Sequence, residues 1–79
     1  MKNELLQNLE RLHTTPLGEV RIKRNLALEV KDVVLWCRQK TTTADLIERK
    51  GKNWYVHTGS TVITINAHSF TIITAHIIL

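Results

Sequence analysis

The sequence predicts an α+β domain in which three short N-terminal helices pack on a four-stranded antiparallel β-meander. Apolar residues recur at helical spacing within the first forty residues, whereas β-branched and aromatic residues gather after residue 44 between turn-forming residues. Helices followed by strands are typical of the α+β class. Because a chain of 79 residues has room for one core, we expect a single domain over residues 1–79, helical over 1–40 and sheet over 44–79.

Leucine spacing and capping residues define the predicted helices. The leucines between Leu5 and Leu12 recur at helical spacing, which predicts an amphipathic helix. Thr15 is a suitable N-cap for the next helix, and Pro16 suits its first position because a proline there loses no hydrogen bond. Valines at helical spacing mark the third helix, and the β-branched run Thr41–Thr43 is expected to end it. We expect helices over residues 3–12, 16–25 and 29–39.

Turn-forming residues divide the second half of the chain into four strands. The expected turns are residues 51–53, 58–59 and 66–69, which contain Gly, Asn or Ser. The segments between them are rich in β-branched and aromatic residues, as strands are. Short connections join antiparallel neighbours, so the expected sheet is a meander. The expected strands are residues 46–49, 54–57, 61–65 and 70–77.

Strand alternation separates a core face of the sheet from an open face. The open face is expected to hold polar side chains, among them Tyr55, His57 and Thr64. The core face is expected to hold Trp54, Val56, Ile63 and Ile65.

The loop before the last strand decides which of its side chains are accessible, because a shift of one residue exchanges the two faces. An even-numbered loop places Thr71, Ile73 and Ala75 on the open face. An odd-numbered loop instead places Phe70, Ile72, Thr74 and His76 there. We favour the odd loop, because it buries Ile73, Ala75 and Ile77 and leaves Thr74 and His76 accessible.

The charge of the chain is uneven. The formal net charge is +4, and residues 49–79 contain three basic residues, three of the four histidines and no acidic residue. A basic segment of this kind favours an anionic partner, with RNA favoured over DNA, although a solvated basic surface has the same composition. The residues expected to contact nucleic acid are Arg21, Lys23, Arg24, Lys50, Lys52 and Tyr55.

Histidines on the open face suggest a chemistry that needs no metal. Imidazoles exchange protons near neutral pH, so a pair of them can cleave RNA through the ribose 2′-hydroxyl. No carboxylate follows Glu48 to hold a metal ion, and we expect neither a metal nor another cofactor. The lone cysteine, Cys37, shares the stripe of Val33 and Val34, and we expect it to be a core residue rather than a nucleophile.

Five segments of the chain together resemble one known family. They are residues 13–18, 21–26, 32–37, 51–56 and 63–76, the last of which ends in Thr74-Ala75-His76. These segments are similar to a small uncharacterised bacterial family, the domain of unknown function 3781, over nearly the whole chain. Members of that family often have a lysine directly after the last histidine, where this chain has Ile77.

The order of helices and meander, with an early histidine and a late Thr-Ala-His, also resembles the phage and toxin ribonucleases grouped as barnase–EndoU–colicin–RelE-like. That second resemblance lies in the order of the elements and not in a specific motif, so the function that it implies rests on an analogy between folds. It implies metal-independent RNA cleavage on a sheet face, with Lys50 and Lys52 on phosphates. The catalytic residues that it implies are His13, Arg49, Thr74 and His76.

Three functions therefore stay open. The first is a small basic cytoplasmic RNA-binding protein, which on this resemblance is also a ribonuclease. The second is a non-catalytic inhibitor of the kind phages carry, which binds a host nucleoprotein complex such as a CRISPR effector. The third is a structural homodimer module held by the apolar tail Ile77–Leu79. We expect no membrane partner, since no apolar run is long enough to span a bilayer.

Overall fold

The computed structural model describes residues 3–78. It has the predicted α+β architecture, with helical segments first and four strands after them. The helical segments are α1 (Glu4–Gln7), the 3₁₀ helix η1 (Leu9–Arg11), α2 (Pro16–Leu26) and α3 (Val33–Thr42). The strands are β1 (Leu46–Lys50), β2 (Asn53–Thr58), β3 (Thr61–Asn66) and β4 (Ile72–Ile77).

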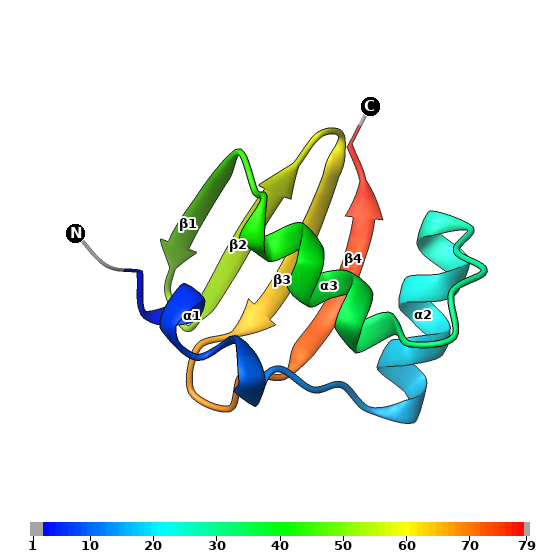
Figure 1. The fold of residues 1–79 in the computed structure, drawn as a ribbon, viewed down its shortest axis with the longest axis horizontal. Coiled ribbons are helices and arrows are strands. Elements are labelled where there is room, and N and C mark those ends of the chain that lie inside the picture. The colour runs from blue at the N-terminus through cyan, green and yellow to red at the C-terminus, as the bar shows by residue number, and fades with distance from the viewer. Residues whose placement is uncertain (1–2, 79) are drawn as a thin grey trace.

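The strands form one antiparallel sheet in the order β1-β2-β3-β4, as predicted. Figure 1 shows α1 and α3 in front of this sheet and α2 beside β4. The turn between β2 and β3 is Gly59-Ser60, one residue later than expected, because Thr58 pairs with Thr61. The shift leaves the same side chains on each face, since it moves the pairing by two residues.

The core lies between the helices and one face of the sheet. Trp54, Val56, Ile63 and Ile65 are all buried in it, as the alternation predicted. Cys37 is fully buried there too, which confirms its place in the core. The core cluster contains none of the open-face side chains of the described residues 3–78: even Val62, which is 4% exposed, lies outside it.

The first predicted helix is in fact two short segments. Asn3 caps α1 by accepting from the backbone N–H groups of Leu5 and Leu6. The Asn8 side chain donates to the carbonyl of Glu4, and such local bonds compete with a continuing helix. The chain therefore leaves the α-helix at Asn8 and continues as η1.

Both ends of α3 differ from the prediction. The helix starts at Val33 rather than residue 29, because Asp32 is its N-cap and accepts from the N–H of Leu35 at 2.9 Å. It also continues through Thr41 and Thr42, which were expected to end it. Their hydroxyls donate to backbone carbonyls one turn earlier, so the helix accommodates them.

The outer edge of β4 is covered by the segment that leads into α2. The N–H of His13 donates to the carbonyl of Phe70, and the N–H of Ile72 donates to the carbonyl of His13. The hydroxyl of Thr14 donates to the carbonyl of Ile72 at 2.8 Å. Helix α2 then packs along β4 through Gly18 and other buried positions. This edge is therefore protected against pairing with another chain.

A bulge in β4 settles the register that the sequence left open. Thr64 pairs with Thr74, but Ile65 pairs with Ile72, so one extra residue, Ile73, stands opposite this step. Thr74 therefore shares the open face with Thr64, as the odd loop predicted. Beyond the bulge the faces exchange, and the prediction that Ile72 lies on the open face is wrong.

The same bulge explains two further differences from the prediction: Phe70 is buried in the core rather than open, and Ile73 is only half-buried. Ile77 has the same face as Ala75, as the odd loop predicted, but it is exposed rather than buried because it lies at the end of β4. Leu79, the last residue of the apolar tail, lies outside the described residues. Of the helices within residues 3–78, none has the length and apolarity that crossing a bilayer requires.

Candidate nucleic-acid interface

The open face of the sheet carries three rows of side chains, each running across the strands. Residues that pair across neighbouring strands share a face, so the registers define the rows directly. The first row is Leu46, His57, Val62 and His76, the second is Glu48, Tyr55, Thr64 and Thr74, and the third is Lys50, Asn53 and Asn66.

Residues from all three rows, together with Ile78, line a shallow depression of about 360 Å³. Val62 is its apolar floor and is nearly fully buried. The other lining residues except Ile78 carry polar groups at their tips, but most of the exposed lining surface is apolar, and the depression is open to solvent on the side away from the core. The lining residues are Glu48, Lys50, Tyr55, His57, Val62, His76 and Ile78.

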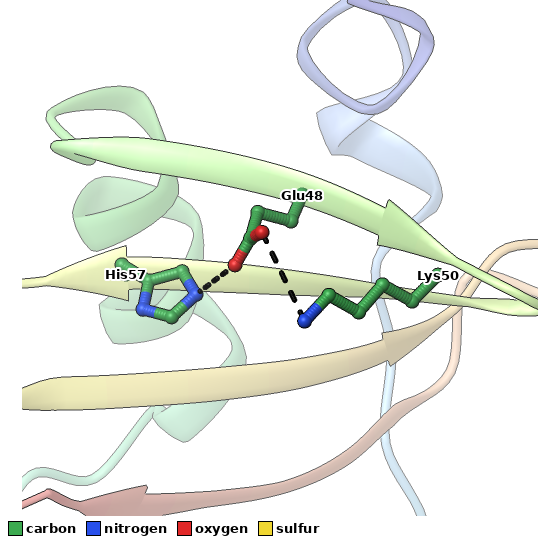
Figure 2. A network of polar contacts seen from close by, with 3 residues as sticks. All are labelled: Glu48, Lys50 and His57. Carbon is green, nitrogen blue, oxygen red and sulfur yellow. Dashed lines mark hydrogen bonds and ion pairs between the residues drawn. The ribbon is translucent and has the colours of Figure 1, made fainter.

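One imidazole in the depression is held by a carboxylate. Nε2 of His57 lies 2.9 Å from Oε1 of Glu48, and Nζ of Lys50 lies 3.9 Å from Oε2 of the same carboxylate. Figure 2 shows the Glu48 carboxylate between the imidazole and the ammonium group. The side chains of Glu48 and His57 are each about one third exposed, so the pair is partly shielded from water yet reachable by a ligand.

Helix α2 forms the rim of the open face beyond β4. The Asn25 amide donates to the Thr74 hydroxyl at 3.4 Å and to the carbonyl of Ala75 at 3.2 Å. Arg21 lies one helical turn before Asn25 and shares its side of the helix, and Arg24 lies next to Arg21 on the helix surface, one turn later. Two exposed cations therefore flank the open face at this rim.

Lys23, in contrast, is on the other side of α2. Its Nζ lies 3.4 Å from Oε1 of Glu19. Glu19 lines a second depression together with the start of α3, on the side of the core. Lys23 is therefore separated from Arg21 and Arg24, with which the sequence grouped it.

The structure does not bring His13 and His76 together. The His13 ring is held at the start of β4, with Nε2 3.0 Å from the Thr71 hydroxyl and Nδ1 2.9 Å from the carbonyl of Arg11. His76 lies near the other end of β4, about 16 Å further along at the rise of an extended strand. The two imidazoles cannot serve one phosphate.

Arg49 also lies away from the open face. Its guanidinium carbon is 5.5 Å from the centre of the Trp54 ring, on the core face, and Nε donates to the carbonyl of Gly51 at 3.0 Å. Lys52 lies in the turn between β1 and β2, outside the depression. Of the four predicted catalytic residues, only Thr74 and His76 share the open face.

Glu48, His57 and Asn25 belong to this site but were not among the predicted site residues, although His57 was expected on the open face. A signal for the first two was present: a tight turn at Gly51 and Lys52 aligns Glu48 with Tyr55, which places Glu48 and His57 on one face. Asn25 had no such signal, because its contacts with β4 join positions about fifty residues apart. Among residues 3–78, no group of three or more His, Cys, Asp or Glu side chains is placed to hold a metal ion.

Comparison with known proteins supports one of the two resemblances. No curated protein and no solved structure matches the chain, so the similarity to ribonucleases gains no support. A family model described as a protein of unknown function, DUF3781, matches residues 6–76. That match begins within α1 and ends at His76, so it covers the other helices and the whole sheet except the last residue of β4. The chain therefore belongs to the DUF3781 family.

Proposed function

We propose that the protein binds single-stranded RNA across the open face of its sheet. The observation that carries this proposal is a depression with an apolar lining and polar groups at its edge, on an uncovered sheet face that has exposed cations at both rims. Arg21 and Arg24 stand at the α2 rim, and Lys50 stands on β1. An extended strand of RNA laid across the strands of the sheet would meet cations at both rims.

Each part of the open face suits a different part of an RNA chain. Tyr55 is half-buried in the depression and offers a ring on which an unpaired base can stack. The hydroxyl of Thr74, which is half-buried, can bond to a ribose 2′-hydroxyl, the group that distinguishes RNA from DNA. The rim cations contact phosphates. The proposed site of action is the cytoplasm, where a lone reduced cysteine is usual.

The test measures polarisation of a fluorescein-labelled single-stranded RNA of mixed sequence at several salt concentrations. Three phosphate contacts, from Arg21, Arg24 and Lys50, give a log–log slope of about −2, since each contact on a single strand contributes about −0.7. Arg21→Gln is expected to weaken binding and to make the slope shallower by about 0.7.

Lys31→Gln is the matched control, because it removes the same charge from an exposed position beside the start of α3, on the core side. It is expected to leave the slope unchanged. Equal losses in Arg21→Gln and Lys31→Gln would contradict the proposal, since they would mean that only net charge matters. Capture of a protein with an affinity that ignores salt would favour the inhibitor hypothesis instead.

A further inference from the structure

We infer that the open face is also a catalytic site, in which His57, held by Glu48, and His76 cleave RNA by an acid–base mechanism. This inference rests on the proposed RNA binding and adds a reaction to it. It assigns the chemistry to two histidines that are nineteen residues apart in the sequence but lie in the first row of the open face. The roles are a general base at His57, a general acid at His76 and a positioning residue at Glu48.

The two imidazoles stand on either side of one apolar floor. His57 pairs with Val62 and Val62 pairs with His76, so the histidines lie two strand spacings apart, about 10 Å between their Cα atoms. Both side chains leave the same face and line the same depression. For rings about as far apart as their Cα atoms, two hydrogen bonds of about 3 Å leave about 4 Å between the two bonded oxygens, which suits the attacking and leaving oxygens of one phosphate group.

The contact with Glu48 fixes which nitrogen of His57 is the base. A carboxylate only accepts hydrogen bonds, so Nε2 of His57 carries the hydrogen that points to Oε1 at 2.9 Å. In the neutral ring the lone pair is then on Nδ1. Figure 2 shows Nδ1 on the side of the ring away from Glu48. His76 is exposed, and neither ring nitrogen has a hydrogen-bond partner within residues 3–78, so this imidazole is free to carry and deliver a proton.

The charged and titratable groups around His57 are few. From β1 they are Glu48 and Lys50, from β2 the phenol of Tyr55, and from β4 His76. Lys50 is two-thirds exposed and only loosely paired with Glu48 at 3.9 Å. Its ammonium group is therefore available to stabilise negative charge that develops on a phosphate in the depression.

The reaction is a transesterification within the RNA. Nδ1 of His57 takes the proton of a ribose 2′-hydroxyl, and the 2′-oxygen forms a bond to the adjacent phosphorus. The bond from phosphorus to the 5′-oxygen of the next nucleotide breaks, and protonated His76 gives its proton to that oxygen. The products are a 2′,3′-cyclic phosphate and a free 5′-hydroxyl. No water, metal ion or redox partner is consumed, and proton exchange with solvent resets the two histidines.

The experiment incubates the protein in EDTA with the same fluorescein-labelled RNA and identifies the product ends by mass spectrometry. Cyclic phosphate ends are expected. A DNA strand of the same base sequence, which lacks the 2′-hydroxyl, is expected to stay intact. His57→Ala and His76→Ala are each expected to slow cleavage by about 10²–10⁴-fold, the usual contribution of an acid–base group. Polarisation is expected to show that both variants still bind the RNA.

His68→Ala is the matched control, because His68 is an exposed histidine in the β3–β4 loop, outside the depression. It is expected to cleave at the parental rate. Glu48→Gln keeps the shape of the side chain but not its charge, and it tests positioning. It is expected to lower kcat with little change in KM, since an amide can also donate a hydrogen bond to the imidazole and no longer fixes which ring nitrogen carries the hydrogen. Thermal melts identify any variant that fails to fold.

The possible outcomes separate this inference from the proposed function. RNA that is bound but never cut overturns the catalytic inference and leaves the binding proposal standing. RNA that is neither bound nor cut overturns both. Cleavage that survives in His57→Ala or His76→Ala also overturns the inference, because it comes from another site or another enzyme.

Discussion

Gly18→Ala is expected to destabilise the protein, although alanine favours a helix over glycine by about 1 kcal/mol. Gly18 is buried in α2 where this helix packs on β4. A methyl group there would overlap the hydroxyl of Thr14 and come within 3.2 Å of the Thr15 hydroxyl and 3.4 Å of the carbonyl of Ile72. The Thr14 hydroxyl is not free to move, because it donates to the same carbonyl at 2.8 Å.

The expected magnitude combines three effects. Displacing Thr14 leaves a part-buried carbonyl without its donor, at a cost of about 1–3 kcal/mol. Overpacking of the contact between α2 and β4 adds about 1–3 kcal/mol, and the gain in helix propensity offsets about 1 kcal/mol. The net loss in the free energy of unfolding is about 1–5 kcal/mol, and each kcal/mol lowers Tm by about 4–8 °C in a domain of this size.

A double-mutant cycle with Thr14→Ala makes this prediction specific. Thr14→Ala removes the hydroxyl that the new methyl group would meet, so Gly18→Ala is expected to cost far less in the Thr14→Ala background. The assay is thermal and urea unfolding of the parent, both single variants and the double variant. Equal costs of Gly18→Ala in the two backgrounds, or a parent that gains stability from it, would refute the packing described for α2.

Three further changes test the core and its caps. Trp54 is 3% exposed and lies 5.2 Å from the Phe70 ring between centroids, so Trp54→Ala is expected to cost about 3–5 kcal/mol, seen in urea unfolding, and an unchanged midpoint would contradict it. Asp32→Ala removes the N-cap of α3 and is expected to cost about 1 kcal/mol, whereas Asp32→Asn is expected to cost much less. Burial raises the pKa of the Cys37 thiol from 9.0 to about 12, so Cys37 is expected to resist thiol reagents until the protein unfolds. Because the folded pKa is the higher one, this thiol lowers stability as pH rises from about 9 towards 12, and a native protein that reacts at the unfolded rate would refute its burial.

Much of the fold was predictable because its signals are local. The alternation of Trp54 and Val56 identified the core face, and Pro16 behind Thr15 marked the start of α2. The cap that starts α3 was also visible in the sequence, since Asp32 directly precedes the valines that begin the helix. The prediction missed it because it followed the apolar spacing back to residue 29.

The rest depended on contacts between distant segments. The bulge at Ile73 reverses the faces of β4 within one residue, and alternation alone has no means of locating it. His13 is fixed by Thr71, far away in the sequence, so its separation from His76 follows only from the fold. The contact between Glu48 and His57 could have been predicted from the tight turn between β1 and β2. That turn pairs Glu48 with Tyr55, and His57 lies two residues further along on the same face.

The most direct test of the account is the map of backbone amide shifts when single-stranded RNA is added to the isotopically labelled protein. Changes are expected on the open face, at Tyr55, His57, Thr64 and His76, together with Arg21 at the rim of α2. Only small changes are expected in α1 and α3, which lie on the core side of the sheet. Changes centred on α3, or none at any RNA concentration, would contradict the claim that the open face is the functional surface.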